Sequence, residues 1–292
     1  MPKSYTTVLL ILLLTITHSA WTLENPWSQV TTPAPGLAQS IGSYSAGCIQ
    51  GAVNLLPDAK DFEIMRPSRR RYFAHPQLRN FVLWFAKAIR DNGYGKLLVG
   101  DLGQARGGPT TTGHASHQIG LDADFWFWLE SGTKGKLTKH DKEHFSAPSM
   151  LNAAQTKINN ARFGEAQIRA LELAARHPQV ERIFVNPIIK QAACRQTQAA
   201  SWLHKVRPWW GHHYHFHVRL GCPTNQPYCK AQEPIPKTDG CGAELEEWFH
   251  PKANETENKQ ERKLTPEQRL AIKLNRLPKE CAAVLRSSEV DN

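Results

Sequence analysis

Two histidine-rich windows, about ninety residues apart, constrain the fold of this chain most strongly. The first reads His114-Ala-Ser-His-Gln-Ile-Gly-Leu-Asp-Ala-Asp124, and the second reads His212-His-Tyr-His-Phe-His217. Imidazole and carboxylate are the usual ligands of catalytic zinc, which keeps one position open for water. The fold therefore has to bring two distant segments together around one metal ion. A solvated histidine patch is the alternative, which two clusters of matching ligand types disfavour.

The second window is predicted to lie on a strand over residues 215–220. Side chains alternate between the two faces of a strand, so His215 and His217 project to the same side, about 7 Å apart. One of them can bind a metal ion while the other faces a substrate.

The first window combines a loop with a strand. After the Gly-rich and Thr-rich segment 100–112, the run 121–129 has a strand-like pattern that places Asp122 and Asp124 on one face. His117 would then come from the loop and Asp124 from the strand. Asp122 either orients a ligand or is a structural carboxylate.

Helices mixed with a small, mostly antiparallel sheet predict an α+β fold with a single zinc-binding catalytic domain. Apolar spacing and end signals predict helices over 78–89, 163–176 and 264–277 and further strands over 96–99 and 182–185. The last helix begins at Thr265-Pro266, where threonine caps and proline occupies the first turn.

The first residues have the pattern of an export signal. Met-Pro-Lys is followed by the short apolar run 8–16 and by small residues near a cut after Ser19 or Ala20. We therefore expect a signal peptide over 1–20, the zinc-binding catalytic domain over 21–250, and a polar linker with a C-terminal segment over 251–292. An uncleaved anchor is the alternative for the first segment, and no later segment is long and apolar enough to predict a stable membrane span.

The six cysteines stand at positions 48, 194, 222, 229, 241 and 281, all beyond the expected signal. In an exported chain an even set predicts three disulfides, among fifteen possible connectivities. A cysteine zinc site is the competing interpretation, and it lacks a Cys-x-x-Cys pair.

The formal net charge is +10, and removal of Lys3 with the signal leaves +9. This positive charge favours a polyanionic partner, namely nucleic acid, acidic lipid or a carboxylate-rich cell-wall polymer. Of these, nucleic acid is disfavoured because no recognisable nucleic-acid-binding motif accompanies the charge. The densest basic group, at positions 66, 69, 70 and 71, is either surface charge or a substrate carboxylate site. A second metal at His140, Asp141 and His144 is less favoured than a solvated surface loop.

The longer sequence motifs around these residues resemble those of one family. His117 with Asp124, and His215 with His217, match the HxxxxxxD and HxH signatures of the lysostaphin, D-Ala-D-Ala metallopeptidase and hedgehog-type zinc-site superfamily. The more specific motifs are Gly-Cys at 47–48, Arg-Arg-Tyr-Phe at 70–73, Gly-His-Ala-Ser-His-Gln at 113–118, Arg-Ile-Phe-Val-Asn-Pro at 182–187, Lys-Val-Arg-Pro-Trp at 205–209, His-Val-Arg-Leu at 217–220 and Gly-Cys-Gly-Ala-Glu-Leu at 240–245. Together they resemble the penicillin-insensitive murein endopeptidases, from about residue 27 to residue 281.

Spacing and the resemblance both assign His117, Asp124 and His217 as ligands of one Zn²⁺. The resemblance also implies an active-site position for His114, either as an additional ligand or beside the ligands. It implies three disulfides, which join Cys48 to Cys281, Cys194 to Cys241, and Cys222 to Cys229.

The remaining histidines of the second window receive other roles. His215 is the best candidate to take the proton from zinc-bound water or to stabilise the oxyanion, and His212 could share either task. His213 departs from the family pattern and is expected to be an exposed bystander.

The activity that the resemblance implies is zinc-dependent hydrolysis, without an acyl-enzyme, of the D-alanyl to meso-diaminopimelyl amide that cross-links peptidoglycan. The protein would act in the periplasm. One alternative is a D-Ala-D-Ala dipeptidase or carboxypeptidase of the same superfamily, and another is a non-catalytic wall-binding protein with structural zinc. The oligomeric state is left open, a homodimer included.

Overall fold

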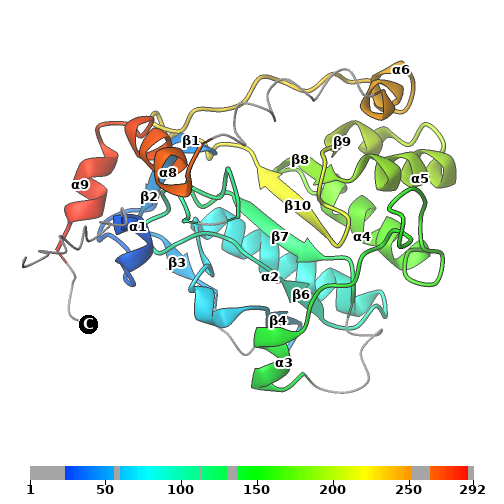
Figure 1. The fold of residues 1–292 in the computed structure, drawn as a ribbon, viewed down its shortest axis with the longest axis horizontal. Helices are drawn as coiled ribbons and strands as arrows, with labels where there is room; N and C mark the ends of the chain where they lie inside the picture. Colours follow the sequence, from blue (N-terminus) through cyan, green and yellow to red (C-terminus); the bar gives the residue numbers. More distant parts are fainter. Residues whose placement is uncertain (1–23, 56–59, 112, 130–136, 251–263, 289–292) are drawn as a thin grey trace, which may run out of the picture.

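The computed structural model describes residues 24–55, 60–111, 113–129, 137–250 and 264–288. The expected signal peptide and most of the polar linker lie outside these residues. The chain is a mixed α and β structure built on one central sheet, as the sequence predicts (Figure 1). Among the helices that the structure describes, none is long and apolar enough to cross a membrane.

The central six-stranded sheet has antiparallel pairs in the middle and a parallel pair at each edge. Its strands, in spatial order, are β4 (Phe62–Ile64), β6 (Leu97–Val99), β7 (Asp122–Trp126), β10 (His215–Leu220), β8 (Val180–Val185) and β9 (Val206–Pro208). Two small antiparallel pairs lie outside it, β1 (Gln39–Ser43) with β2 (Ala46–Gln50) and β3 (Val53–Asn54) with β5 (Phe73–Ala74).

The helices surround this sheet. They are α1 (Pro26–Gln29), α2 (Pro76–Asp91), α3 (Lys139–His144), α4 (Glu165–Arg176), α5 (Pro187–Thr197), α6 (Ala243–Glu246), α8 (Pro266–Asn275) and α9 (Cys281–Arg286), with 3-10 turns η1 (Pro67–Arg69), η3 (Ser201–Lys205) and η4 (Glu247–Phe249). The predicted helices correspond to α2, α4 and α8, and α8 begins with the expected threonine cap and proline. The predicted loop around residue 140 is wrong, because Thr138 and Asp141 form a capping box that starts α3.

The core packs one face of the sheet against α2, which runs across it (Figure 1). Phe125 of β7 and Phe216 of β10 point toward this helix, where the ring centroids lie 5.2 and 6.1 Å from that of Phe85. Because side chains alternate along a strand, Asp124 and His217 point to the opposite face. The apolar periodicity of the two strands therefore also positions their polar residues.

The C-terminal helices lie beside β1 and β2 (Figure 1). The disulfide between Cys48 and Cys281 joins β2 to the start of α9. Arg106, which is 2% exposed, donates hydrogen bonds to the carbonyl groups of Val284 and Leu285 at the end of that helix. The segment is thus fixed to the loop that leads into the first histidine window.

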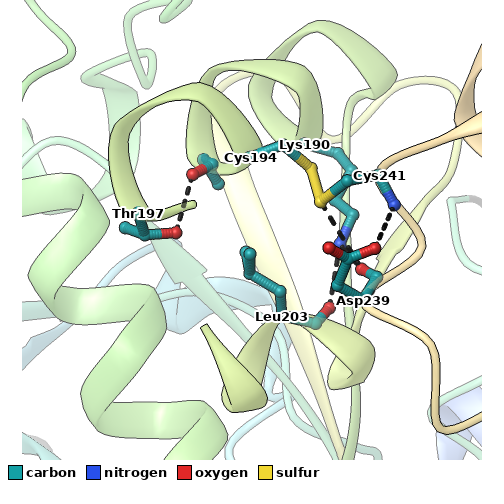
Figure 2. Close-up of a disulfide and its surroundings, with 7 residues drawn as sticks. Lys190, Cys194, Thr197, Leu203, Asp239 and Cys241 are labelled. Carbon is teal, nitrogen blue, oxygen red and sulfur yellow. Dashed lines mark hydrogen bonds between the residues drawn. A yellow bond between two sulfur atoms is a disulfide. The ribbon is translucent and has the colours of Figure 1, made fainter. Parts of the chain in front are cut away.

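The other two disulfides join Cys194 to Cys241 and Cys222 to Cys229, so all three have the pairing that the resemblance implies. Figure 2 shows the first of these beside Lys190, whose side chain is fully buried. Its ammonium group donates to the carbonyl oxygens of Leu203 (2.8 Å) and Asp239 (2.5 Å). The disulfide and the lysine together hold the segment before α6 against α5.

Candidate metal centre

The register of β7 against β10 brings the two histidine windows together. The strands are antiparallel, with His217 opposite Asp124 and Arg219 opposite Asp122. His117 precedes β7 in a loop, as predicted, and its backbone has a left-handed φ of 65°. Such a conformation is uncommon outside glycine and turns the imidazole back toward the strands.

Three ligand atoms form a small, nearly regular triangle. His117 Nε2 lies 3.2 Å from His217 Nδ1, and Asp124 Oδ1 lies 3.4 and 3.3 Å from these two atoms. Ligands of a tetrahedral zinc ion at about 2.0–2.2 Å from the metal are roughly 3.3–3.5 Å apart. Asp124 Oδ1 is also buried and accepts no hydrogen bond among the described residues. The donor types, their spacing and this unsatisfied oxygen fit a zinc ion.

Hydrogen bonds on the far side of each ring fix its tautomer. His117 Nδ1 donates to the carbonyl oxygen of Leu102 (2.5 Å), and His217 Nε2 donates to Asp122 Oδ1 (2.8 Å). With these protons assigned, His117 Nε2 and His217 Nδ1 carry lone pairs, and both lie beside Asp124 Oδ1. The two rings are therefore prepared to bind a cation before any is present.

Asp122 is fully buried beneath the centre. Besides His217, its carboxylate accepts from Arg219 Nε (2.7 Å), Arg219 Nη2 (3.3 Å) and the backbone N–H of His117 (3.0 Å). Of the two roles left open for Asp122, the contacts support orientation of the ligands, and the same carboxylate also pairs with a buried cation. Arg219 in turn lies 4.1 Å from the ring centroid of Tyr44.

His114 lies at the edge of the centre. Its Nε2 is 2.9 Å from Asp101 Oδ2 and 3.5 Å from Asp124 Oδ2, and its ring centroid is 4.2 Å from that of His117. Together, His114, His117 and Asp124 also have ligand atoms within 4.8 Å of one another. We favour the triangle that includes His217 as the ligand set, because the edges of that triangle match tetrahedral spacing and Asp101 already engages His114 Nε2.

The other two expected histidines lie on the open side. His215 Nε2 is 3.7 Å from Asp124 Oδ1, while its Nδ1 is buried without a hydrogen-bond partner among the described residues. His212 has a strained φ of 27°, and its ring centroid lies 4.9 Å from that of His215. Its Nδ1 donates to the carbonyl oxygen of Trp210 (3.1 Å).

The buried charged groups of the centre shift one another's pKa values. Burial raises the pKa of Asp124, but the nearby His117, His215 and His114 outweigh burial and hold that pKa well below its usual range. Burial likewise opposes the charge on His117, yet Asp124 raises the pKa of His117 to about 9. The carboxylate of Asp124 thus favours a positive charge at this place, and a cation held by His117, Asp124 and His217 would supply it.

The structure brings together all six residues of the two histidine windows that were assigned ligand or catalytic roles, which are His114, His117, Asp124, His212, His215 and His217. The group proposed for a second metal, His140, Asp141 and His144, lies elsewhere, on α3. His213 is half-buried instead of exposed, because its Nδ1 bonds to Ser149 Oγ (2.9 Å). The group on α3 has the ring centroids of His140 and His144 4.5 Å apart, but Asp141 bonds to Thr138, and a second metal there stays a prediction.

Two functional residues were missed from the sequence. Arg219 could have been found, because pairing His217 with Asp124 in an antiparallel register places Arg219 opposite Asp122. Asp101 carries no local sequence pattern, and its role depends on tertiary contacts with Arg71 and His114. Burial raises its pKa, but these partners outweigh burial and lower that pKa to about 2.

Comparison with known proteins identifies the family. The family model described as penicillin-insensitive murein endopeptidase matches residues 40–286. The chain belongs to this family. It is 44% identical over 230 residues to the protein of that name from Yersinia enterocolitica serotype O:8 / biotype 1B, covering 77% of this chain and 82% of the relative. It is 39% identical over 275 residues to the Escherichia coli O1:K1 / APEC protein of the same name, covering 94% and 96%.

Proposed function

We propose that this chain is a zinc-dependent murein endopeptidase of the periplasm. It hydrolyses the D-alanyl to meso-diaminopimelyl amide that joins neighbouring peptide stems of peptidoglycan. The observation that carries the zinc assignment is the triangle of His117, Asp124 and His217. Its edges are 3.2–3.4 Å, and one of its corners, Asp124 Oδ1, is buried without a hydrogen bond among the described residues. The names of the relatives support murein as the substrate.

Zinc held by these three side chains would lower the pKa of its bound water to roughly 7 and polarise the scissile carbonyl group. Three protein ligands suit a catalytic site better than a closed structural one, which usually has four. The engagement of His114 Nε2 by Asp101 supports the open arrangement. The hydrogen bond with His114 and the positive charge of Arg71 keep the carboxylate of Asp101 ionised.

The chain's own residues supply the proton transfer. His215 Nε2 lies 3.7 Å from the ligand oxygen of Asp124, so this nitrogen can accept a proton from the attacking water and return it to the leaving amine. His212 packs against His215 and keeps its ring in place. Water adds across the amide: the acyl carbon gains the hydroxyl group, and the nitrogen gains the proton. No serine ester forms, which accounts for indifference to penicillin.

Export supports the same assignment. The three disulfides require an oxidising compartment, and an exported cell-wall enzyme works in one. The polymer it meets is rich in carboxylates, to which the net charge of +9 that remains after removal of Lys3 with the signal is complementary.

The test uses cross-linked muropeptide dimers purified from a cell wall. Mass spectrometry after incubation with the protein should find monomers in place of dimers, and a chelator should abolish the conversion until zinc is restored. Loss of terminal alanine with dimers intact would instead indicate a trimming carboxypeptidase.

Matched histidine variants separate the site from its surroundings. His117→Ala should lose zinc and dimer cleavage together, whereas His213→Ala, in the same window as His215 but bonded to Ser149, should keep both. Binding of zinc without any hydrolysis of murein would refute the enzymatic proposal.

A further inference from the structure

A cavity of about 280 Å³ opens beside the proposed metal centre. Its walls carry His114, Asp124 and His215 from the centre, Trp126 from the end of β7, Tyr214 from the residue before β10, and Arg66 and Arg69 from the segment around η1. A group bound in this cavity would therefore lie next to the atoms that react. The sequence assigned the arginines of this segment either to surface charge or to a substrate carboxylate, and the structure separates them.

The backbone around η1 is held rigidly in a sparsely populated conformation. Arg66 and Arg70, on either side of the turn, have left-handed φ values of 60° and 51°. The N–H of Arg66 donates to the carbonyl oxygen of Lys142 (2.8 Å), and the N–H of Ser68 donates to Glu143 (3.2 Å). Such conformations persist only where the surroundings enforce them, and they concentrate at functional sites. Here α3 enforces a turn that points Arg66 into the cavity wall.

The four arginines of this segment have different partners. Arg71 and Arg69 both bond to Asp101 Oδ2, at 2.8 and 3.2 Å, so they neutralise the carboxylate that holds His114. Arg70 is exposed and does not line the cavity. Arg66 lines the cavity, is half-buried, and donates only to a neutral acceptor among the described residues, the carbonyl oxygen of Phe145 at 3.3 Å. Of the two arginines that line the cavity, Arg66 is thus the one without an ion pair to a carboxylate among the described residues.

We propose that Arg66 binds a substrate carboxylate in this cavity, namely the one on the carbon that carries the scissile amide nitrogen. The inference rests on the proposed function. In the D-alanyl to diaminopimelyl amide, that carbon is bonded to the amide nitrogen and carries a free carboxylate, whose carbon is two bonds from the nitrogen. The anion must therefore lie within a few ångströms of the reacting atoms. Guanidinium binds a carboxylate through paired N–H donors, which gives direction as well as charge.

The remaining charges of the cavity support an anionic ligand. Of its two acids, Asp101 already accepts from Arg69, Arg71 and His114, and Asp124 belongs to the metal centre. Neither acid contacts Arg66. Outside the cavity, Glu143 of α3 is near enough to interact electrostatically with Arg66, but no ion pair joins the two among the described residues. A substrate carboxylate at Arg66 thus meets a cation that neither acid of the cavity pairs, whereas the corresponding carboxamide would lose the charge and one acceptor. Arg66 is therefore a specificity-determining residue that selects the free acid.

The experiment compares two dimeric muropeptides with the zinc-loaded, full-length protein. In one dimer the carboxyl group beside the scissile nitrogen is free, and in the other it is a carboxamide. The wild-type kcat/KM should favour the free acid by roughly 10- to 100-fold, the range for a hydrogen-bonded charge pair. Arg66→Gln should bring this ratio close to one by slowing the free acid alone, and Arg66→Lys should restore part of the preference. Arg70→Gln is the matched control and should keep the wild-type ratio.

Each result decides the question. A preference for the free acid that Arg66→Gln removes supports the proposal. Equal cleavage of both dimers by wild type overturns it without any variant and leaves the proposed function intact. A similar loss on both dimers in Arg66→Gln, at unchanged zinc content and melting temperature, also overturns it, because a general role would not discriminate. If wild type with bound zinc cleaves neither dimer, the proposed function fails, and this inference fails with it.

Discussion

Asp122 offers the sharpest test of how the fold prepares the metal centre. Its buried carboxylate accepts hydrogen bonds from His217, from Arg219 twice, and from the backbone of His117. Asp122→Asn keeps the shape but removes the charge and replaces one acceptor with an N–H donor. The new side-chain N–H would then face one of these groups, each of which is itself a hydrogen-bond donor. The substitution therefore leaves Arg219 without its buried counter-charge and His217 without a fixed tautomer.

The size of the effect follows from these contacts. Removing one partner of a buried ion pair costs roughly 3–5 kcal/mol of unfolding free energy. For a domain of this size, about 2–4 °C of melting temperature corresponds to each kcal/mol, so the expected decrease is on the order of 6–20 °C. Loss of the residue that orients a metal-bound histidine typically lowers metal affinity or activity roughly 10- to 100-fold.

The assay combines thermal unfolding of the zinc-free protein with a competitive titration of zinc affinity. The double variant Asp122→Asn/Arg219→Met separates the two effects: removal of the buried cation should recover part of the stability but none of the zinc affinity, because His217 stays unsupported. Asp91→Asn, at an exposed carboxylate of α2, should leave zinc affinity unchanged. If Asp122→Asn unfolds within about 1 kcal/mol of wild type and binds zinc within about threefold, the assigned role is refuted.

Three further predictions concern the rest of the chain. His215→Ala should keep zinc but lose about a hundredfold in rate, whereas His217→Ala should lose zinc as well; the reverse pattern, measured by metal analysis and dimer cleavage, would exchange their roles. Opening the disulfide that spans 233 residues, with a Cys48→Ser/Cys281→Ser variant, should lower the unfolding free energy by roughly 2–5 kcal/mol in denaturant titrations; a greater loss of zinc affinity than of stability would contradict a structural role. Burial lowers the pKa of Lys190 to about 7, whereas the unfolded chain keeps a value near 10.5 and binds more protons between these values. The unfolding free energy of wild type should therefore rise relative to Lys190→Met as pH increases from 7 to 10, by roughly 1–4 kcal/mol, and a constant difference would refute the shift.

Local sequence patterns predicted the elements that carry the site. The apolar spacing of 78–89 predicts α2, because one face of a helix must be buried for that helix to be stable. Alternation on 215–220 places His215 and His217 on one side of a strand, and the structure has β10 over these residues. Both patterns depend on the geometry of a single element, which is why the sequence alone could predict them.

Tertiary structure decided which of these residues meet. The register of β7 against β10 pairs Asp122 with Arg219, and no property of either segment alone sets that register. The four arginines at 66, 69, 70 and 71 are chemically equivalent in the sequence. In the structure Arg66 and Arg69 both line the cavity, and Asp101 pairs with Arg69 and Arg71 but not with Arg66.

The sequence by itself thus determined an even set of cysteines and the helices and strands that carry the candidate ligands, and it predicted the types of those ligands. The order of strands in the sheet, the role of Asp101 and the partner of each arginine depend on segments that are distant along the chain. Packing of the whole chain brings those segments together, because local propensity acts over a few residues and long-range contacts are selected by burial and charge pairing in the complete fold.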